Sequence, residues 1–301
     1  MQRRFVTVDV FTRHLFGGNP LAVVLDPGGL TATQMQQIAA EFNLSETTFV
    51  FPPEDARHTA QVRIFTPRAE LPFAGHPNIG TAFVLAQVGE IYGKAIGDRL
   101  VFEEVAGLVK LTLLRDDGGL TGARLTAPQP FTRMQDLSPA IVAAACGLEP
   151  NDIDAGLHQP CVASAGLPFV FAGLHSRERL AAASPRKQLM ARHLPMDVAG
   201  GVFVYAPADE PDVDYQARMF APLQGISEDP ATGSANVALI GLLAEIDAAT
   251  DLHLVKRIAQ GVDMGRPSLL IAEAEKRDGV VATVRISGRC VGVMQGHLSV
   301  D

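Results

Sequence analysis

The feature that most constrains this chain is an internal repeat. Residues 74–86, AGHPNIGTAFVLA, align without a gap with residues 232–244, TGSANVALIGLLA, and agree at four positions, including Gly75 and Gly233. Both segments read as a glycine turn followed by an apolar helix. A repeat of this kind indicates that the chain contains two copies of one structural unit.

Two weaker matches precede the first one in the same order. RIFTP at 63–67 resembles RMFAP at 218–222, and GNPLAVV at 18–24 resembles GLPFVFA at 166–172. A chain of 301 residues has room for two domains. We therefore predict a first lobe over residues 1–128 and a second over 129–301, with the last strand able to cross back to the first.

The two repeated helices carry no charge. Residues 74–89 and 231–244 contain no Asp, Glu, Lys or Arg. A helix without a polar face is buried on all sides. The sequence thus predicts an α/β (α+β) fold with two pseudo-symmetric lobes, each a curved sheet or barrel wrapped around a central buried helix.

The remaining pattern predicts strands and amphipathic helices around these two helices. Alternation and turn residues predict strands at 5–10, 21–25, 44–50 and 62–65, and a hairpin over 101–114. In the second half we expect one helix over 177–193 and separate strands at 280–286 and 290–294. A linker is expected between Asp116 and Pro130, where Gly, Asp and Pro are frequent.

The starts of the two repeated helices predict a binding site. Free backbone N–H groups and the positive end of the helix dipole favour anions. If the lobes pack as mates, Gly75 and Gly233 lie on opposite walls of one cleft. Such a cleft suits a small carboxylate as the partner.

Polar residues gather near these turns, and each has a simpler interpretation. Glu46 shares strand parity with buried positions, although a strand glutamate is mostly exposed. His76 could be a cap or loop residue, Asp229 a turn former, and Ser234 the N-cap of its helix. Only the repeat, which places His76 and Ser234 at equivalent helix starts, brings these residues together.

Composition and motifs exclude several classes. A net charge of −8 without a basic cluster argues against nucleic acid or an anionic membrane as partner. The glycines at 75 and 80 lack a P-loop lysine, and no HExxH or CxxC is present, so we expect neither nucleotide nor metal. The first residues do not form a signal peptide, no apolar run could span a bilayer, and three unevenly spaced cysteines suit a reducing cytoplasm.

Five segments together carry a family resemblance. FGGNPLAVVLD, NLSETTFVFPP, RIFTPRAELPFAGHPNIGTA, SEDPATGSAN and MGRPS occur in this order between about Val8 and Gly296. They resemble the phenazine-biosynthesis PhzF-like family. The resemblance implies the fold of diaminopimelate epimerase and proline racemase, no cofactor, and a homodimer. The two cysteines of those racemases correspond to Ala74 and Pro230, so racemisation by two cysteines is not expected.

The resemblance also implies roles for individual residues. The glutamate of the SET segment, Glu46, would move a proton between substrate carbons, as it does on a dihydro-hydroxyanthranilate ring in the phenazine enzyme. His76 and Asp229 would orient or assist, Ser234 would bind substrate or steady Asp229, and the amides at Gly75 and Gly233 would hold substrate. The expected function is a cofactor-independent isomerase of a small carboxylic acid. The alternative is a non-catalytic metabolite-binding or interaction protein on the same scaffold.

Overall fold

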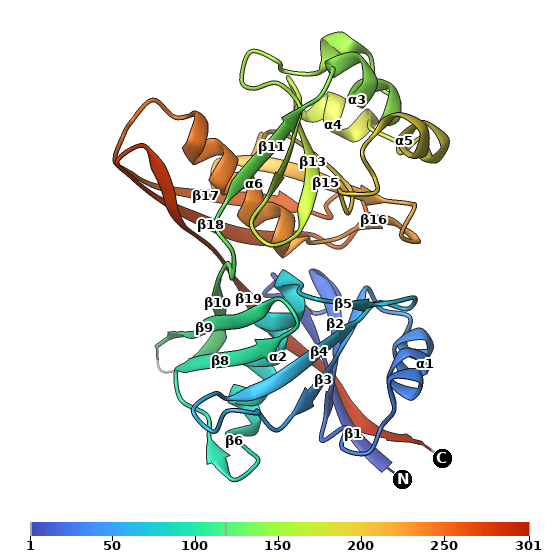
Figure 1. The fold of residues 1–301 in the computed structure, drawn as a ribbon, viewed down its shortest axis with the longest axis vertical. Coiled ribbons are helices and arrows are strands. Elements are labelled where there is room, and N and C mark those ends of the chain that lie inside the picture. The colour runs from blue at the N-terminus through green and yellow to red at the C-terminus, as the bar shows by residue number, and fades with distance from the viewer. Residues whose placement is uncertain (1, 118, 301) are drawn as a thin grey trace. The chain divides into compact units, whose positions relative to one another are not determined.

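A computed structural model of the chain describes residues 2–117 and 119–300 (Figure 1). The chain divides into two compact units. The first holds the chain up to Pro128 together with the end of the chain from Ser287, and the second holds Gln129–Ile286. The long last strand, β19 (Val280–Ser299), therefore begins in the second unit and ends in the first.

The first unit contains mainly strands, with one amphipathic helix and one apolar helix. Its elements are β1 (Gln2–Val10), β2 (Asn19–Leu25), α1 (Ala32–Phe42), β3 (Glu46–Phe51), β4 (Ala60–Phe65), β5 (Glu70–Leu71), α2 (Gly75–Val88), β6 (Glu90–Ile91), β7 (Lys94–Ala95), β8 (Arg99–Glu104), β9 (Gly107–Asp116) and β10 (Gly119–Thr126).

The strands of the first unit close into a barrel. Antiparallel pairs join β1 to β2, β3 to β4, β8 to β9 and β9 to β10, and parallel pairs join β2 to β3 and β4 to β8. β19 pairs with both β10 and β1, which completes the ring. Helix α2 contacts β1, β2, β3, β9 and β10, so it lies inside the barrel.

The burial of α2 follows from its sequence. Residues 75–85 of this helix are all buried, as expected for a helix without a charged face. A Cβ on Gly80 would lie 2.6 Å from the Leu21 side chain, so the glycine lets the helix approach β1 and β2 closely. Inside the barrel the Thr48 and Thr81 hydroxyls meet at 2.8 Å and tie the helix to β3.

The second unit adds several short helices to a comparable set of strands. Its elements are β11 (Thr132–Asp136), α3 (Pro139–Ala145), the 3₁₀ helix η1 (Pro150–Asp152), β12 (Cys161–Ser164), β13 (Pro168–Gly173), α4 (Arg177–Ala182), α5 (Lys187–His193), β14 (Val202–Pro207), β15 (Tyr215–Ala221), β16 (Ile226–Asp229), α6 (Gly233–Ile246), β17 (Leu252–Gln260), β18 (Ser268–Arg277) and the first part of β19.

The pairing plan of the first unit recurs in the second. The parallel pairs β13–β14 and β15–β17 correspond to β2–β3 and β4–β8 of the first unit. The antiparallel pairs β12–β13, β14–β15, β15–β16 and β17–β18 correspond, in this order, to β1–β2, β3–β4, β4–β5 and β8–β9. Helix α6 contacts β12, β13, β17 and β18 and is buried over residues 233–244. The predicted fold class, a sheet around a buried helix in each of two similar units, is confirmed.

Side-chain interactions repeat as well. Arg63 bonds Glu70 at 2.7 Å in the first unit, and Arg218 bonds Glu228 at 2.8 Å in the second. Each guanidinium also lies over the ring of the phenylalanine two residues further on. The weak RIFTP/RMFAP match thus marks the same arginine position in each unit.

Three predicted elements were wrong. The helix expected over 177–193 is two helices, α4 and α5, because Pro185 between them cannot continue a helix. The boundary between the units, after Pro128, lies inside the range expected for the linker, but most of that range is β10, whose pairing with β9 is not visible in local composition. The strands expected at 280–286 and 290–294 are one strand, β19.

Candidate active site

One end of the first barrel gathers the polar residues of the first repeat. β2 begins with Asn19, β3 begins with Glu46, and α2 begins with Gly75 and His76. β2 and β3 are parallel and neighbouring, so their first residues lie at the same end of the sheet. Asn19 and His76 are buried there among apolar side chains.

The structure brings Glu46 and His76 together. The Nε2 atom of His76 lies 3.3 Å from Oε2 of Glu46, and the two side chains are 4% and 12% exposed respectively. On the other side of the ring, Nδ1 of His76 lies 3.3 Å from Nδ2 of Asn19. Glu46 is therefore not a surface strand residue, and His76 is neither a cap nor a loop residue.

His76 is neutral at physiological pH. Burial lowers the pKa of His76 to about 3, against a smaller opposing effect of a hydrogen bond with the Pro20 backbone. The 3.3 Å approach to Glu46 is thus a close polar contact of an uncharged imidazole rather than an ion pair. A neutral imidazole can donate to a carboxylate from Nε2, or accept there from a carboxylic acid when its proton is on Nδ1.

The second repeat places Asp229 before its own buried helix. Asp229 ends β16, is 5% exposed, and accepts a 2.6 Å hydrogen bond from the Thr232 hydroxyl through Oδ2. Gly233 and Ser234 are the first two residues of α6, and both are buried. The N-cap of α6 is Thr232, so the interpretation of Ser234 as N-cap was wrong.

A buried glutamine holds this turn in place. Gln260, the last residue of β17, accepts from the Thr232 amide at 3.0 Å and from Asn236 at 2.9 Å through Oε1. Its Nε2 donates to the backbone oxygen of Asp229 at 2.9 Å and to the Thr232 hydroxyl at 3.0 Å. Both ends of the amide are therefore used to fix the segment that carries Asp229.

The two helix starts are built alike. α2 begins at Gly75 and α6 at Gly233, and neither Ala74 nor Thr232 caps its helix with a side-chain hydrogen bond. The first backbone N–H groups of such a helix remain available to an anionic ligand.

Comparison with known proteins identifies the family. Residues 8–296 match the family model described as phenazine biosynthesis-like protein. The trans-2,3-dihydro-3-hydroxyanthranilate isomerase of Pseudomonas aeruginosa is 36% identical over 301 residues, covering 98% of each chain. The chain belongs to the phenazine biosynthesis-like (PhzF) family.

Solved structures show how widely this fold occurs. A PhzF-family protein from Bacillus anthracis is similar over the whole of both chains, with a TM-score of 0.87 at 23% identity. A hydroxyproline epimerase from Agrobacterium vitis shares the fold, with a TM-score of 0.63 and 15% identity over 99% of this chain and 91% of its own. The predicted relation to the epimerase fold is thereby confirmed.

Family membership also settles the broad class of the protein. The chain is an enzyme, an isomerase of the PhzF family, since its characterised relatives carry this activity in their names. The alternative of a non-catalytic binding protein receives no support from these relatives.

The cysteines lie apart from these residues and are unreactive in character. Cys146, Cys161 and Cys290 are free and buried. Burial raises the pKa of Cys146 to about 12 and that of Cys161 to about 11. Across residues 2–117 and 119–300, no three His, Cys, Asp or Glu side chains cluster closely enough to hold a metal ion. In the same part of the chain, no helix is both long and apolar enough to cross a bilayer.

Three residues of these clusters were missed from the sequence. Asn19 follows a glycine turn, and apart from its place in the repeat nothing in the sequence marked it as a partner of His76. Thr232 lies two residues before Ser234 at the N-cap position, and its hydroxyl bonds Asp229 rather than capping the helix. Gln260 could have been found only as a polar residue at the end of an otherwise alternating strand.

Proposed function

We propose that this enzyme moves a proton, and with it a double bond, on a small carboxylic acid without a cofactor. Glu46 acts as the general acid and base. The observation that carries this proposal is a nearly buried carboxyl group held against a neutral imidazole at the start of a buried helix.

The chemistry requires one group that can take a proton from carbon and return it. A carboxyl group shielded from water can do both. Burial disfavours the charged carboxylate, and so brings the free energies of the acid and the carboxylate closer together at neutral pH. His76 can hydrogen-bond either state by changing tautomer, and it does so without acquiring a charge. The role of His76 in the proposal is therefore to orient Glu46 and keep water away.

The substrate carboxylate would bind at the helix starts. The amides at Gly75 and Gly233 and the Ser234 hydroxyl are the donors we assign to it, and Asp229 would assist the proton transfer. This assignment is supported by the lack of a capping side chain at either helix start.

The first experiment is a substrate test. Trans-2,3-dihydro-3-hydroxyanthranilate, the compound named for the Pseudomonas aeruginosa relative, is the first probe, followed by related unsaturated ring acids. Turnover in deuterated water, followed by NMR, should place deuterium on a substrate carbon. Turnover that depends on an added metal or nucleotide would overturn the proposal. A complete lack of turnover and of thermal stabilisation across the panel would also overturn it.

Two further assignments are part of the proposal. We assign the enzyme to the cytoplasm, which suits three cysteines that remain as thiols. We also expect a homodimer, which the family resemblance implies. Light scattering coupled to size-exclusion chromatography gives the mass directly, and a mass of one chain at micromolar concentration would contradict the dimer.

A further inference from the structure

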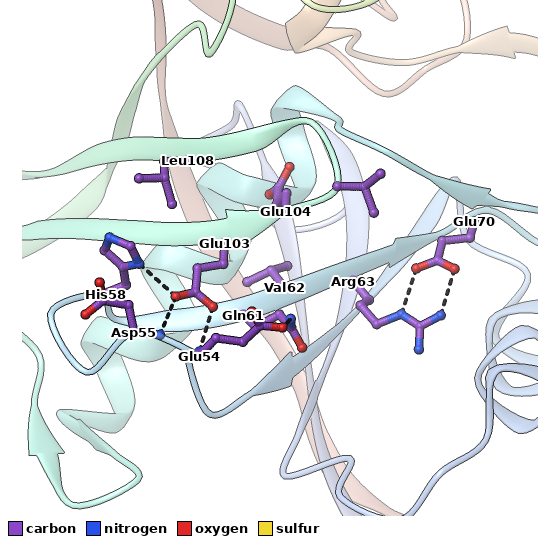
Figure 2. Close-up of a pocket in the computed structure, with 11 residues that line it drawn as sticks. Glu54, Asp55, His58, Gln61, Val62, Arg63, Glu70, Glu103, Glu104 and Leu108 are labelled. Atoms are coloured by element: carbon purple, nitrogen blue, oxygen red, sulfur yellow. Dashed lines mark hydrogen bonds and ion pairs between the residues drawn. The ribbon is translucent and has the colours of Figure 1, made fainter.

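Glu104 occupies an unusual position in the first barrel. It is the last residue of β8 and shares strand parity with Leu100 and Phe102, which are 1% and 0% exposed and face the barrel interior. Its neighbour Glu103 faces the other way and bonds His58 and the amides of residues 54 and 55 (Figure 2). In that view the Glu104 carboxyl points away from this outer cluster.

The Glu104 carboxyl has little to stabilise a charge. Both of its oxygens are buried and, among the described residues, neither makes a hydrogen bond of normal length. The polar side chain that acts on it is that of Asn78, in the first turn of α2. Asn78 donates from Nδ2 to the Ala74 backbone oxygen at 2.8 Å, which fixes the turn that carries His76.

Glu104 and the Glu46–His76 pair lie at the same end of the barrel. The first turn of α2 carries both His76 and Asn78, and Asn78 is the polar side chain that acts on Glu104. Two residues after Glu104, the Ala106 amide donates to the Pro72 oxygen at 3.0 Å, just before this turn. Glu104 is therefore a second carboxyl group at the barrel end that holds Glu46.

The second unit shows what occupies the equivalent position. Gln61 of β4 pairs with Glu103, and Gln216 of β15 pairs with Ala259. Because the repeat aligns Arg63 with Arg218, Gln61 corresponds to Gln216, and the residue after Glu103 corresponds to Gln260.

Gln260 makes the contact that this equivalence predicts. Asn236, the counterpart of Asn78, donates to Gln260 at 2.9 Å and to the Thr232 oxygen at 2.9 Å. In the second unit, a neutral amide thus holds the asparagine of the helix start. Gln260 also donates from Nε2, and a glutamate in the same place can act as both donor and acceptor only when it is protonated.

We propose that Glu104 keeps its proton in the folded protein and serves as the carboxylic-acid counterpart of Gln260, a positioning residue for the first turn of α2. The protonation itself requires no substrate. Its consequence for His76 and Glu46 rests on the proposed function.

Electrostatics agrees with this geometry. Burial raises the pKa of Glu104 well above its usual value, and the Asn78 amide opposes this only in part. The charged or titratable groups on the surrounding elements are Glu46 on β3, His76 on α2, Arg63 on β4, Glu70 on β5, Arg99 and Glu103 on β8, and Lys110, Arg115 and Asp116 on β9. None of them contributes to the shift. Without a paired cation, a buried carboxylate is strongly disfavoured relative to its acid.

The test compares stability with pH in Glu104→Gln and the wild type. Above a pKa of about 4.3 the unfolded chain releases the Glu104 proton while the folded chain retains it. The folding equilibrium constant of the wild type should therefore fall about tenfold per pH unit relative to Glu104→Gln, until the folded pKa is reached. Urea unfolding between pH 5 and pH 8 measures this difference.

Two variants control the interpretation. Gln260→Glu should introduce the same pH-dependent loss of stability into the second unit. Glu103→Gln should leave the pH dependence between pH 5 and pH 8 unchanged. Burial opposes the shift, but hydrogen bonds lower the pKa of Glu103, so its stabilisation is lost only as the pH falls below the unfolded value of about 4.3. A pH-independent difference between wild type and Glu104→Gln would overturn the proposal, as would a wild type that gains stability relative to Glu104→Gln with rising pH.

A spectroscopic measurement does not depend on how the variants fold. The wild type at neutral pH should show the infrared carbonyl band of a protonated carboxylic acid, and the absence of that band would overturn the proposal. For the positioning role, the ¹⁵N shifts of the His76 ring should be preserved in Glu104→Gln and altered in Glu104→Ala. Unchanged shifts in Glu104→Ala would show that Glu104 does not position the turn.

Discussion

Replacement of Glu46 by glutamine is the sharpest perturbation of the proposed mechanism. The amide has the size of the carboxyl group but cannot accept a proton from carbon. Loss of general acid–base catalysis costs about 10²–10⁴-fold in rate. At about 1.4 kcal/mol per tenfold, the barrier should rise by roughly 3–5 kcal/mol.

The structure predicts that stability changes much less than rate. His76 is uncharged, so the 3.3 Å contact with Glu46 is not an ion pair whose loss would expose a buried charge. A glutamine can donate to or accept from the same imidazole. The difference in unfolding free energy should therefore stay within the value of one hydrogen bond, about 0.5–1.5 kcal/mol.

The assay follows kcat/KM on the substrate found in the initial screen, together with deuterium incorporation and ligand-induced thermal shift. We expect activity and incorporation to fall together while ligand binding is largely retained, because the helix starts bind the carboxylate. Glu70→Gln is the matched control, since it neutralises a carboxylate of the same unit that pairs with Arg63 near the surface. Near wild-type turnover in Glu46→Gln would refute the role of Glu46.

Three further predictions concern the elements around these residues. His76→Asn should remove a loss of folding stability that the wild type shows at low pH. Burial lowers the pKa of His76 from 6.5 to about 3, so between these pH values only the unfolded state binds the proton. Urea midpoints should therefore show the wild type losing on the order of 3 kcal/mol relative to the variant between pH 7 and pH 4, and a constant difference would contradict the neutral imidazole. Gly80→Ala should destabilise the protein by about 1–3 kcal/mol in thermal unfolding, because its Cβ would crowd the barrel wall. Gly97→Ala, with open space around the new Cβ, should have little effect, and equal effects would contradict tight packing of α2. Thr232→Val removes the hydroxyl that donates to Asp229 at 2.6 Å and should cost about 1.5–3 kcal/mol of stability, as well as activity. Thr232→Ser should retain both stability and activity, because serine keeps the hydroxyl. A Thr232→Val variant as active as the wild type would show that the bond to Asp229 is not needed for activity.

The architecture followed largely from local sequence pattern. The repeat located α2 and α6 at equivalent positions, and their lack of charge predicted that both are buried. These properties are local, since a helix with no polar face has no stable position at a surface. The strands with clear alternation of apolar and polar residues could also be predicted, because that pattern too is local in the sequence.

Closure of the barrel depended on contacts between distant parts of the chain. β19 completes the first ring with residues from the end of the sequence, and β10 lies in a segment whose composition resembles a linker. Strand pairing depends on partners that no local window contains.

The electrostatic character of the candidate site depended on tertiary structure even more. The sequence placed Glu46 and His76 in one hypothesis, but only packing shows that the imidazole is buried and uncharged. Only packing shows that Thr232 rather than Ser234 is the N-cap, and that Gln260 supports the turn before α6. Residue type and spacing determined which groups this protein contains and where the buried helices begin. The protonation of those groups and their hydrogen-bond partners were determined by burial and by strand register, which arise only when distant segments pack together.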